Sequence, residues 1–284
     1  MKQMMPPRLH RALSRLRHAP PPSYDDRYPR VDVFEWRPAG SAINFGDRLA
    51  TVVAERVLAL HGRSLDEETA RDATLFTVGS VMHFAKTGDT VWGSGVNGKI
   101  PADRHAFDAL DIRAVRGPLT AAFLSERGLD VPAVYGDPAL LLPTLFPDRF
   151  KRHSARPVLF VPNLHDLTLA PTLGLPFVSP LRGWNAVVEQ IVGADLVLAS
   201  SLHGVVIAEA FGIPARHVRL TETEPPFKYD DYARGTGRSG IDSANSVAEA
   251  LEMGARRRYP SIPRRCSRHS RTICGSESWL PLIR

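Results

Sequence analysis

The chain has 284 residues, a formal net charge of +6 and a hydrophobic content of 43%. These values are typical of a globular protein with one or two domains, and they exclude a mostly disordered chain, a collagen and a disulfide scaffold. The two cysteines, Cys266 and Cys274, lack metal-ligand spacing and favour a reducing, cytoplasmic setting. No apolar run is long enough for a membrane span or placed as in a signal peptide, so we expect neither.

Basic residues are concentrated at the two ends of the chain. Residues 1–30 carry a net charge of +5 and residues 255–284 carry +7, which leaves −6 on residues 31–254. The pI of about 9.6 is therefore a property of the ends and does not indicate nucleic-acid binding. We expect a Pro-rich N-terminal segment and a C-terminal tail that are both disordered. Peripheral contact of these tails with an anionic membrane is the alternative.

Between these ends, short apolar segments alternate with segments of helical periodicity. In the first half we expect strands at 31–36, 73–79, 89–95 and 111–117, and helices at 45–60 and 118–127. In the second half we expect strands at 158–162, 175–180, 195–201 and 213–220, and helices at 184–194, 203–212 and 243–253. This alternation predicts an α/β fold of two Rossmann-like halves, with parallel sheets and helices on both faces. We place the N-terminal domain at 31–150 and the C-terminal domain at 151–254.

Ligands of open α/β sheets bind beyond the carboxyl ends of the strands, so residues that follow strands are the candidates for function. After the first strand, Gly46 permits close approach of a ligand, and Asn44 and Asp47 can bind hydroxyl groups. Helix capping is the alternative role for the last two. Ser80 and Gly95 lie at the ends of two later strands. These strand ends form either a wall that a ligand approaches or tight turns. The absence of GxGxxG and Walker A motifs argues against dinucleotide and P-loop sites.

Arg116 directly follows an apolar strand and precedes a helix that begins with Pro118. Its planar guanidinium group suits a phosphate or carboxylate ligand. A structural ion pair, for instance with Asp137, is the alternative.

The strongest candidate is a histidine at a strand–helix junction, in the segment Ser200-Ser201-Leu-His203-Gly204. A helix N-terminus attracts anions, and histidine transfers protons near neutral pH. A Ser–His hydrolase is disfavoured because GxSxG is absent and Ser201 is too close to His203 in sequence. No metal-ligand spacing is present, so we expect no metal site.

Five short motifs follow one another along residues 31–250. They are Asn44-Phe-Gly46-Asp47, Val91-Trp-Gly-Ser-Gly95, Val115-Arg-Gly-Pro-Leu-Thr120, Asp137-Pro-Ala-Leu and Ser201-Leu-His203-Gly. In this order and spacing they resemble the polysaccharide pyruvyl transferase family. Within the family they are most similar to the branch that forms pyruvate ketals on exopolysaccharides of the succinoglycan type.

The resemblance implies a two-domain fold similar to GT-B glycosyltransferases. It implies phosphoenolpyruvate as the donor substrate, with no other cofactor. The acceptor would be a hexose of an exopolysaccharide or of its lipid-linked precursor at the inner face of the plasma membrane. The products would be a cyclic pyruvate ketal and phosphate. Family members place a histidine and an arginine on the donor, and these correspond to His203 and Arg116. Some members have an arginine where this chain has Ser201, so Arg182 and Lys228 are candidates for a replacement cation.

These considerations lead to a hypothesis for the site. His203 carries the proton, with Ser200, Ser201 and Gly204 beside it on the donor. Asn44, Gly46, Asp47, Ser80 and Gly95 hold the acceptor, and Asp47 is the candidate base. Two alternatives stay open, which are a GT-B glycosyltransferase that uses a nucleotide sugar and a non-catalytic family member that binds glycan.

Overall fold

The computed structural model describes residues 32–37, 43–65, 73–254 and 271–272. The disordered tails predicted at 1–30 and 255–284 lie outside these ranges, except for a two-residue strand, β10 (Arg271–Thr272). The described ranges form an α/β structure with parallel sheets, as the sequence predicts.

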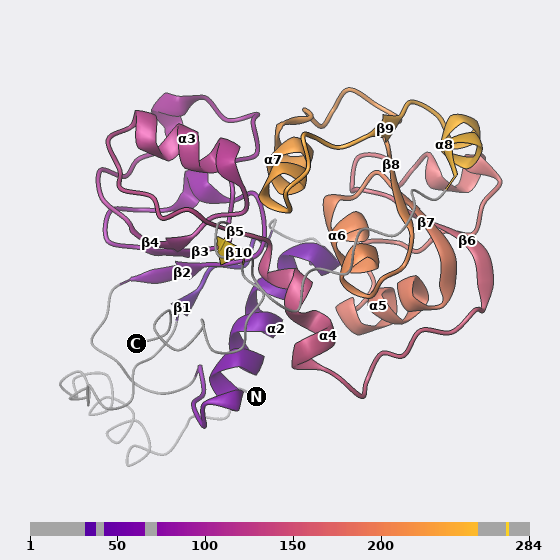
Figure 1. Cartoon of the computed structure of the whole chain (residues 1–284), viewed down its shortest axis with the longest axis horizontal. Coiled ribbons are helices and arrows are strands. Elements are labelled where there is room, and N and C mark those ends of the chain that lie inside the picture. Colours follow the sequence, from indigo (N-terminus) through magenta and orange to yellow (C-terminus); the bar gives the residue numbers. More distant parts are fainter. Residues whose placement is uncertain (1–31, 38–42, 66–72, 255–270, 273–284) are drawn as a thin grey trace, which may run out of the picture.

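The first sheet has four parallel strands in the order β1-β2-β3-β4. These strands are β1 (Asp32–Val33), β2 (Thr74–Phe76), β3 (Thr90–Trp92) and β4 (Asp111–Ala114). Beyond β4, a bridge from Val115 to Tyr135 leads to β5 (Val134–Tyr135), which pairs with β10. Helices α2 (Phe45–Leu60) and α3 (Pro118–Glu126) lie on opposite faces of this sheet (Figure 1).

The second sheet is also parallel, in the order β6-β7-β8-β9. Its strands are β6 (Arg156–Val161), β7 (Ala194–Ala199), β8 (Ala215–Val218) and β9 (Ser243–Ala244), and its helices are α5 (Trp184–Val192), α6 (Leu202–Ala210), α7 (Phe227–Gly235) and α8 (Val247–Met253). The short helix α4 (Leu142–Leu145) precedes β6. Both faces of this sheet are covered, because Leu159 and Val161 belong to the core cluster that includes α5 and α6, whereas Phe160 packs in the cluster that includes Ala250 of α8.

Several elements differ from the sequence-based expectation, and β5 and α4 were not predicted. The strand predicted at 175–180 forms only an isolated bridge between Phe177 and Phe160, because Pro176 and Pro180 lack the N–H donors that a strand ladder needs. The helix predicted at 243–253 begins later, at Val247, and β9 precedes it. Helix α7 was not predicted, because its sequence is polar and rich in charged residues.

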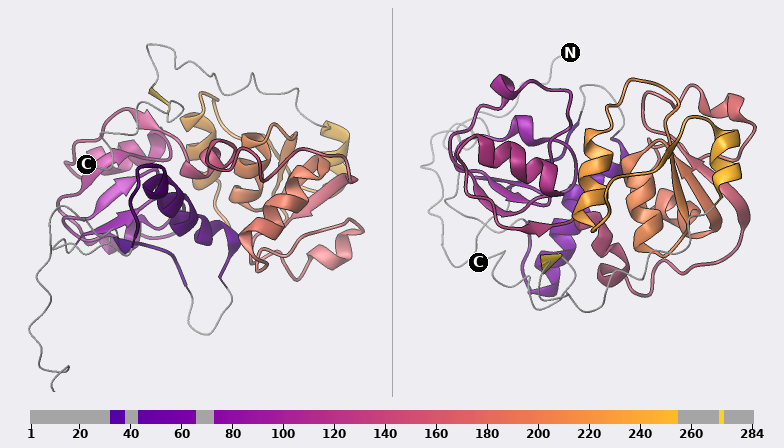
Figure 2. Two further views of the ribbon diagram at one scale, coloured as in Figure 1. Left: turned by 90° about the horizontal axis from the view of Figure 1, so that it is seen from below. Right: turned by 45° about the horizontal axis from the view of Figure 1, so that its top comes forward.

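Helices that follow strands of one sheet in sequence also pack against elements of the other. Although α2 follows the first strand in sequence, its Phe45, Leu49 and Val53 share one buried cluster with Val187 of α5 and Val205 of α6. In the other direction, α7 packs against α3 of the first sheet. Figure 2 shows α2 along the junction, and Figure 1 shows α7 beside α3. One continuous core therefore joins elements that surround both sheets.

A buried ion pair attaches α7 to the first sheet. Arg116, directly after β4, and Asp231 of α7 are both fully buried, and the Arg116 Nη2 atom lies 3.0 Å from Asp231 Oδ2. The same carboxylate accepts hydrogen bonds from the backbone N–H and the hydroxyl of Thr120, at 2.9 and 2.7 Å. A Cβ at Gly117 or Gly235 would overlap the facing backbone. The contact between α7 and the first sheet therefore depends on both charge and close approach.

We expect Asp231→Asn to destabilise the protein by about 3–5 kcal/mol, because it leaves the Arg116 cation buried without its counter-charge. Equilibrium urea unfolding measures this loss. Asp103→Asn is the matched control, because Asp103 is exposed. Equal unfolding free energies for Asp231→Asn and the parent chain would show that the ion pair contributes nothing to stability.

Candidate functional site

A cavity of about 490 Å³ opens between the two sheets. Its walls come from segments that follow β1, β2 and β3 in the first sheet and β6, β7 and β8 in the second, together with the first turns of α2, α6 and α7. The strand order shows no reversal within either sheet among the described strands. The cavity therefore lies where the carboxyl ends of two sheets face each other, and not at a switch point inside one sheet.

His203 lines this cavity from the first turn of α6. Ser201 caps the helix, since its hydroxyl accepts a hydrogen bond from the Gly204 N–H at 3.3 Å. Gly204 itself faces the sheet, where a Cβ would lie 2.9 Å from side-chain atoms of Val161 and Ala199. Close packing of α6 on β6 and β7 therefore sets the position of the imidazole ring.

Asp137 is the acidic partner of His203. The His203 Nε2 and Asp137 Oδ2 atoms are 3.6 Å apart, and neither has a hydrogen-bond partner in the described structure. The other Asp137 oxygen accepts from the Ala139 N–H at 2.9 Å, and the residue is almost fully buried. A buried carboxylate at this distance orients the ring and favours a proton on Nε2.

The first turn of α2 brings Asn44, Gly46 and Asp47 to the same cavity. A Cβ at residue 46 would overlap His203 Nδ1, so Gly46 allows the helix to pack against the imidazole. The Asn44 side chain caps α2 by accepting from the Gly46 N–H at 2.9 Å, and it also lines the cavity.

Asp47 lines the cavity close to two positive groups. Burial raises the pKa of its carboxyl group to about 6, while the charges of His203 and Lys228 oppose this rise. A carboxylate with a pKa near 6 is ionised at neutral pH and accepts a proton more readily than an exposed aspartate.

Arg116 does not line the cavity. Its Nη1 donates to the Ser80 hydroxyl and its Nη2 to the Val96 carbonyl at 2.6 Å, in addition to the pair with Asp231. Gly95 leaves room for the guanidinium, since a Cβ there would lie 2.5 Å from its Cζ atom. These partners hold the buried guanidinium inside the core. The expected contact of Arg116 with a donor stays a prediction.

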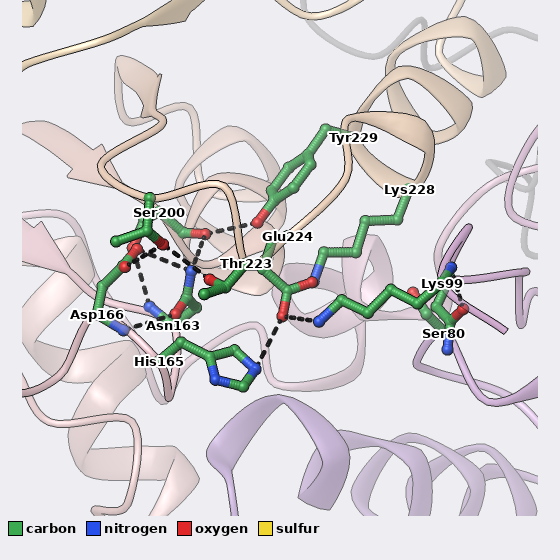
Figure 3. A network of polar contacts seen from close by, with 12 residues as sticks. Ser80, Lys99, Asn163, His165, Asp166, Ser200, Thr223, Glu224, Lys228 and Tyr229 are labelled. Carbon is green, nitrogen blue, oxygen red and sulfur yellow. Dashed lines mark hydrogen bonds and ion pairs between the residues drawn. The ribbon is translucent and has the colours of Figure 1, made fainter.

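A charged network forms another part of the cavity wall (Figure 3). The Glu224 carboxylate lies 2.5 Å from the Lys228 ammonium, 2.7 Å from that of Lys99 and 3.3 Å from His165 Nε2. All four residues line the cavity. Burial lowers the pKa of Lys228, against the opposing effect of Glu224.

Aromatic side chains form a third part of the wall. Phe84 lines the cavity and is 41% exposed, and Trp36 and His83 lie beside it in the lining. The Phe84 ring stacks on Phe34 with centroids 5.0 Å apart, and Phe34 stacks in turn on buried Phe76 at 4.8 Å. An aromatic column therefore runs from the core to the cavity and ends in an exposed ring.

Comparison with known proteins identifies the family of the chain. Residues 75–220, half of the chain, match the family model for polysaccharide pyruvyl transferase. The chain belongs to this family. It is also 30% identical over 203 residues to the succinoglycan biosynthesis protein ExoV of Rhizobium meliloti (strain 1021). That alignment covers 66% of this chain and 63% of the relative, so the match spans less than two thirds of the relative's length.

The resemblance to pyruvyl transferases seen in the sequence is thus confirmed, and the structure places the predicted site residues in two groups. The cavity is lined by Asn44, Asp47, Ser80, Ser201, His203 and Lys228. The other group lies behind the wall or away from it. Gly46, Gly95 and Gly204 have packing roles there, and Ser200 is buried with its hydroxyl accepting from the Asn163 N–H. Arg182 is exposed and is absent from the cavity wall.

Several residues in or beside this cavity were not predicted from the sequence. Asp137 faces His203 but is not one of the lining residues. The sequence suggested it only as an ion-pair partner for Arg116, although it also begins one of the five family-like motifs. Lys99, His165 and Glu224 carry no local motif, and only the packing of distant loops brings them together.

None of the helices in the described ranges has the length and apolar character needed to cross a membrane.

The raised pKa of Asp47 predicts a stability change on replacement by asparagine. The folded-state pKa of about 6 exceeds the ordinary value of 3.8, so ionisation costs stability as pH rises through this window, by about 3 kcal/mol when complete. We expect Asp47→Asn to be more stable than the parent chain at pH 8 and to lose this advantage at pH 4.

Urea unfolding at both pH values measures the difference, with exposed Asp148→Asn as the control. A pH-independent difference between Asp47→Asn and the parent chain would contradict the raised pKa.

Proposed function

We propose that this pyruvyl transferase family member transfers pyruvate from phosphoenolpyruvate to a hexose of an exopolysaccharide or its lipid-linked precursor. The products are a cyclic pyruvate ketal and phosphate. The observation that carries the proposal is the position of His203, on the cavity wall at a helix N-terminus, with Asp47 and Asp137 close to it. An acid and a base on one wall are what ketal formation needs.

The donor carries a phosphate and a carboxylate, so its site needs positive charge. Lys228 supplies an ammonium group on the wall, and the N-terminus of α6 adds the partial positive charge of its free N–H groups. Arg116 contributes indirectly, because its ion pair holds α7, which carries Lys228. No cofactor enters the proposed reaction.

Ketal formation then proceeds by proton transfers that balance. His203 gives a proton to C3 of the enol, and C2 becomes an electrophile. A sugar hydroxyl attacks C2 and loses its proton to the Asp47 carboxylate. A second hydroxyl attacks C2 as the C2–O bond to phosphate breaks, and its proton returns to His203. The departing phosphate takes the proton held by Asp47, which restores the carboxylate. Asp137 keeps the imidazole ring oriented through the cycle.

We expect His203→Ala to fold and to lower kcat for pyruvyl transfer by about 10²–10⁴, because general acid–base catalysis contributes a factor of this size. Phosphate release in the presence of donor and acceptor measures the rate. The control is His153→Ala, since His153 is exposed and lies outside the cavity wall. Near-normal turnover by a folded His203→Ala protein would remove the role that we assign to it.

The acceptor side of the proposed site is the aromatic wall. The C–H face of a hexose packs well on an aromatic ring, and a few polar groups set the orientation of its hydroxyls. Phe84 offers an exposed ring, and Asn44, Asp47 and Ser80 are polar neighbours in the same lining. This shared lining supports Asp47 as the group that accepts a proton from a hydroxyl of the bound sugar.

We expect Phe84→Ala to raise KM for the acceptor by up to about tenfold with little change in KM for the donor, since an aromatic contact contributes about 0.5–1.5 kcal/mol beyond area burial. Phe84→Tyr keeps the ring and is expected to retain most of the affinity. Steady-state kinetics with each substrate varied in turn separates the two constants. An equal loss for donor and acceptor would contradict an acceptor platform.

The two parallel sheets with a cavity between their carboxyl ends support a GT-B-like arrangement, which we include in the proposal. We place the reaction in the cytoplasm, at the inner face of the plasma membrane, where a lipid-linked acceptor is presented. The donor distinguishes this proposal from a nucleotide-sugar glycosyltransferase. Thermal stabilisation by phosphoenolpyruvate, and not by UDP-, GDP- or ADP-sugars, supports pyruvyl transfer, whereas the reverse result supports the alternative.

A further inference from the structure

Glu224 is the centre of a cluster of opposite charges in the cavity. The Glu224 cluster consists of this carboxylate with Lys99, Lys228 and His165, at distances of 2.7, 2.5 and 3.3 Å. Figure 3 shows the two ammonium groups and the imidazole directed at the same carboxylate from different sides. One anion therefore serves three nitrogen donors.

The members of the Glu224 cluster come from separate parts of the fold. Lys99 follows β3 of the first sheet, His165 follows β6 of the second, and Lys228 lies in the first turn of α7. Glu224 itself lies in the turn between β8 and α7, outside any helix or strand. The three nitrogen donors thus surround one position in the cavity. The Glu224 carboxylate, which is carried by a loop, fills this position.

The charges in the cluster do not balance. Burial raises the pKa of Glu224, but the ammonium groups of Lys228 and Lys99 outweigh this effect and lower it overall, so the carboxylate is ionised near neutral pH. Two ammonium groups then face a single negative charge. Together with the half-exposed His165, they leave the position suited to an anion with more than one negative charge.

The cluster also differs from a structural ion pair of this protein. The Arg116 and Asp231 side chains are fully buried, whereas every side chain of the Glu224 cluster is partly exposed, from 13% for Glu224 and 15% for Lys228 to 32% for Lys99 and 54% for His165. Partly exposed ion pairs contribute little to folding stability. Their exposed surface faces the cavity that they line, where a ligand can reach them.

We propose that Glu224 is an internal counter-ion, which a phosphate or carboxylate group of the substrate displaces from between Lys99 and Lys228. In the bound state the substrate anion accepts hydrogen bonds from both ammonium groups and from His165. The loop position of Glu224 allows its side chain to turn away. That this anion belongs to phosphoenolpyruvate rests on the proposed function, whereas the anion subsite itself rests on the geometry of the Glu224 cluster.

If Glu224 is a displaceable counter-ion, removing its charge should increase the affinity of the site for anions. We expect Glu224→Gln to bind inorganic phosphate and phosphoenolpyruvate about tenfold more tightly than the parent chain, since one repulsive charge is removed at short range in a partly screened site. Isothermal titration calorimetry of the full chain measures both affinities. The matched control is Glu222→Gln. Glu222 lies two residues before Glu224, is exposed and pairs with Arg219, which is not a member of the cluster.

A second variant tests the positive side of the same subsite. We expect Lys99→Gln to weaken phosphate binding about tenfold, whereas Lys86→Gln, which removes an exposed lysine outside the cavity wall, leaves it unchanged. Thermal unfolding establishes that each variant is folded. If Glu224→Gln does not fold, the comparison of Lys99→Gln with Lys86→Gln decides.

The outcomes separate this inference from the proposed function. Unchanged or weaker phosphate binding in folded Glu224→Gln overturns the inference, as does unchanged binding in Lys99→Gln. If phosphate affinities change as expected but phosphoenolpyruvate is never turned over, the anion subsite stands and the proposed function fails. If turnover is normal and depends on His203 while Glu224→Gln gains no affinity, the inference alone fails.

Discussion

The guanidinium of Arg116 and the carboxylate of Asp231 meet where the first sheet contacts a helix that belongs, by sequence, to the second. Their ion pair holds α7 in place, and α7 carries two side chains that shape the cavity. Lys228 contributes its ammonium group to the wall, and the Tyr229 hydroxyl donates to the Ser200 carbonyl at 2.7 Å, beside the N-terminus of α6. A fully buried interaction therefore positions the Lys228 charge and supports the junction that presents His203.

The cavity that this ion pair organises holds charged groups at an electrostatic cost. The pKa of Asp47 is raised and that of Lys228 is lowered, in both cases chiefly by burial. The facing atoms of His203 and Asp137 make no hydrogen bond within the described structure. Charged groups held in such surroundings lower stability, and they are typical of sites where a ligand or a proton transfer completes the set of interactions. The rest of the fold, with its continuous apolar core, compensates for this cost.

Local sequence was most informative at the junction between a strand and the helix that follows it. Asn44, Asp47 and His203 were predicted as site residues for this reason, and all three line the cavity. Arg116 also follows a strand, yet it points into the core toward Asp231. This partner is 115 residues away in sequence, so local sequence could not predict the contact. The same limit applies to α7, whose polar sequence gives a weak local signal and whose packing partner α3 is distant in sequence.

The sequence by itself determined the alternation of strands and helices, the α/β class and the family, because apolar periodicity, glycine positions and short motifs are local properties. Tertiary structure alone decided which charged groups meet. Glu224 receives Lys99 from a loop 125 residues away, and Asp137 faces His203 across the junction of the two sheets. The energies of such contacts depend on distance and burial after folding, and neither is encoded in the spacing of residues along the chain.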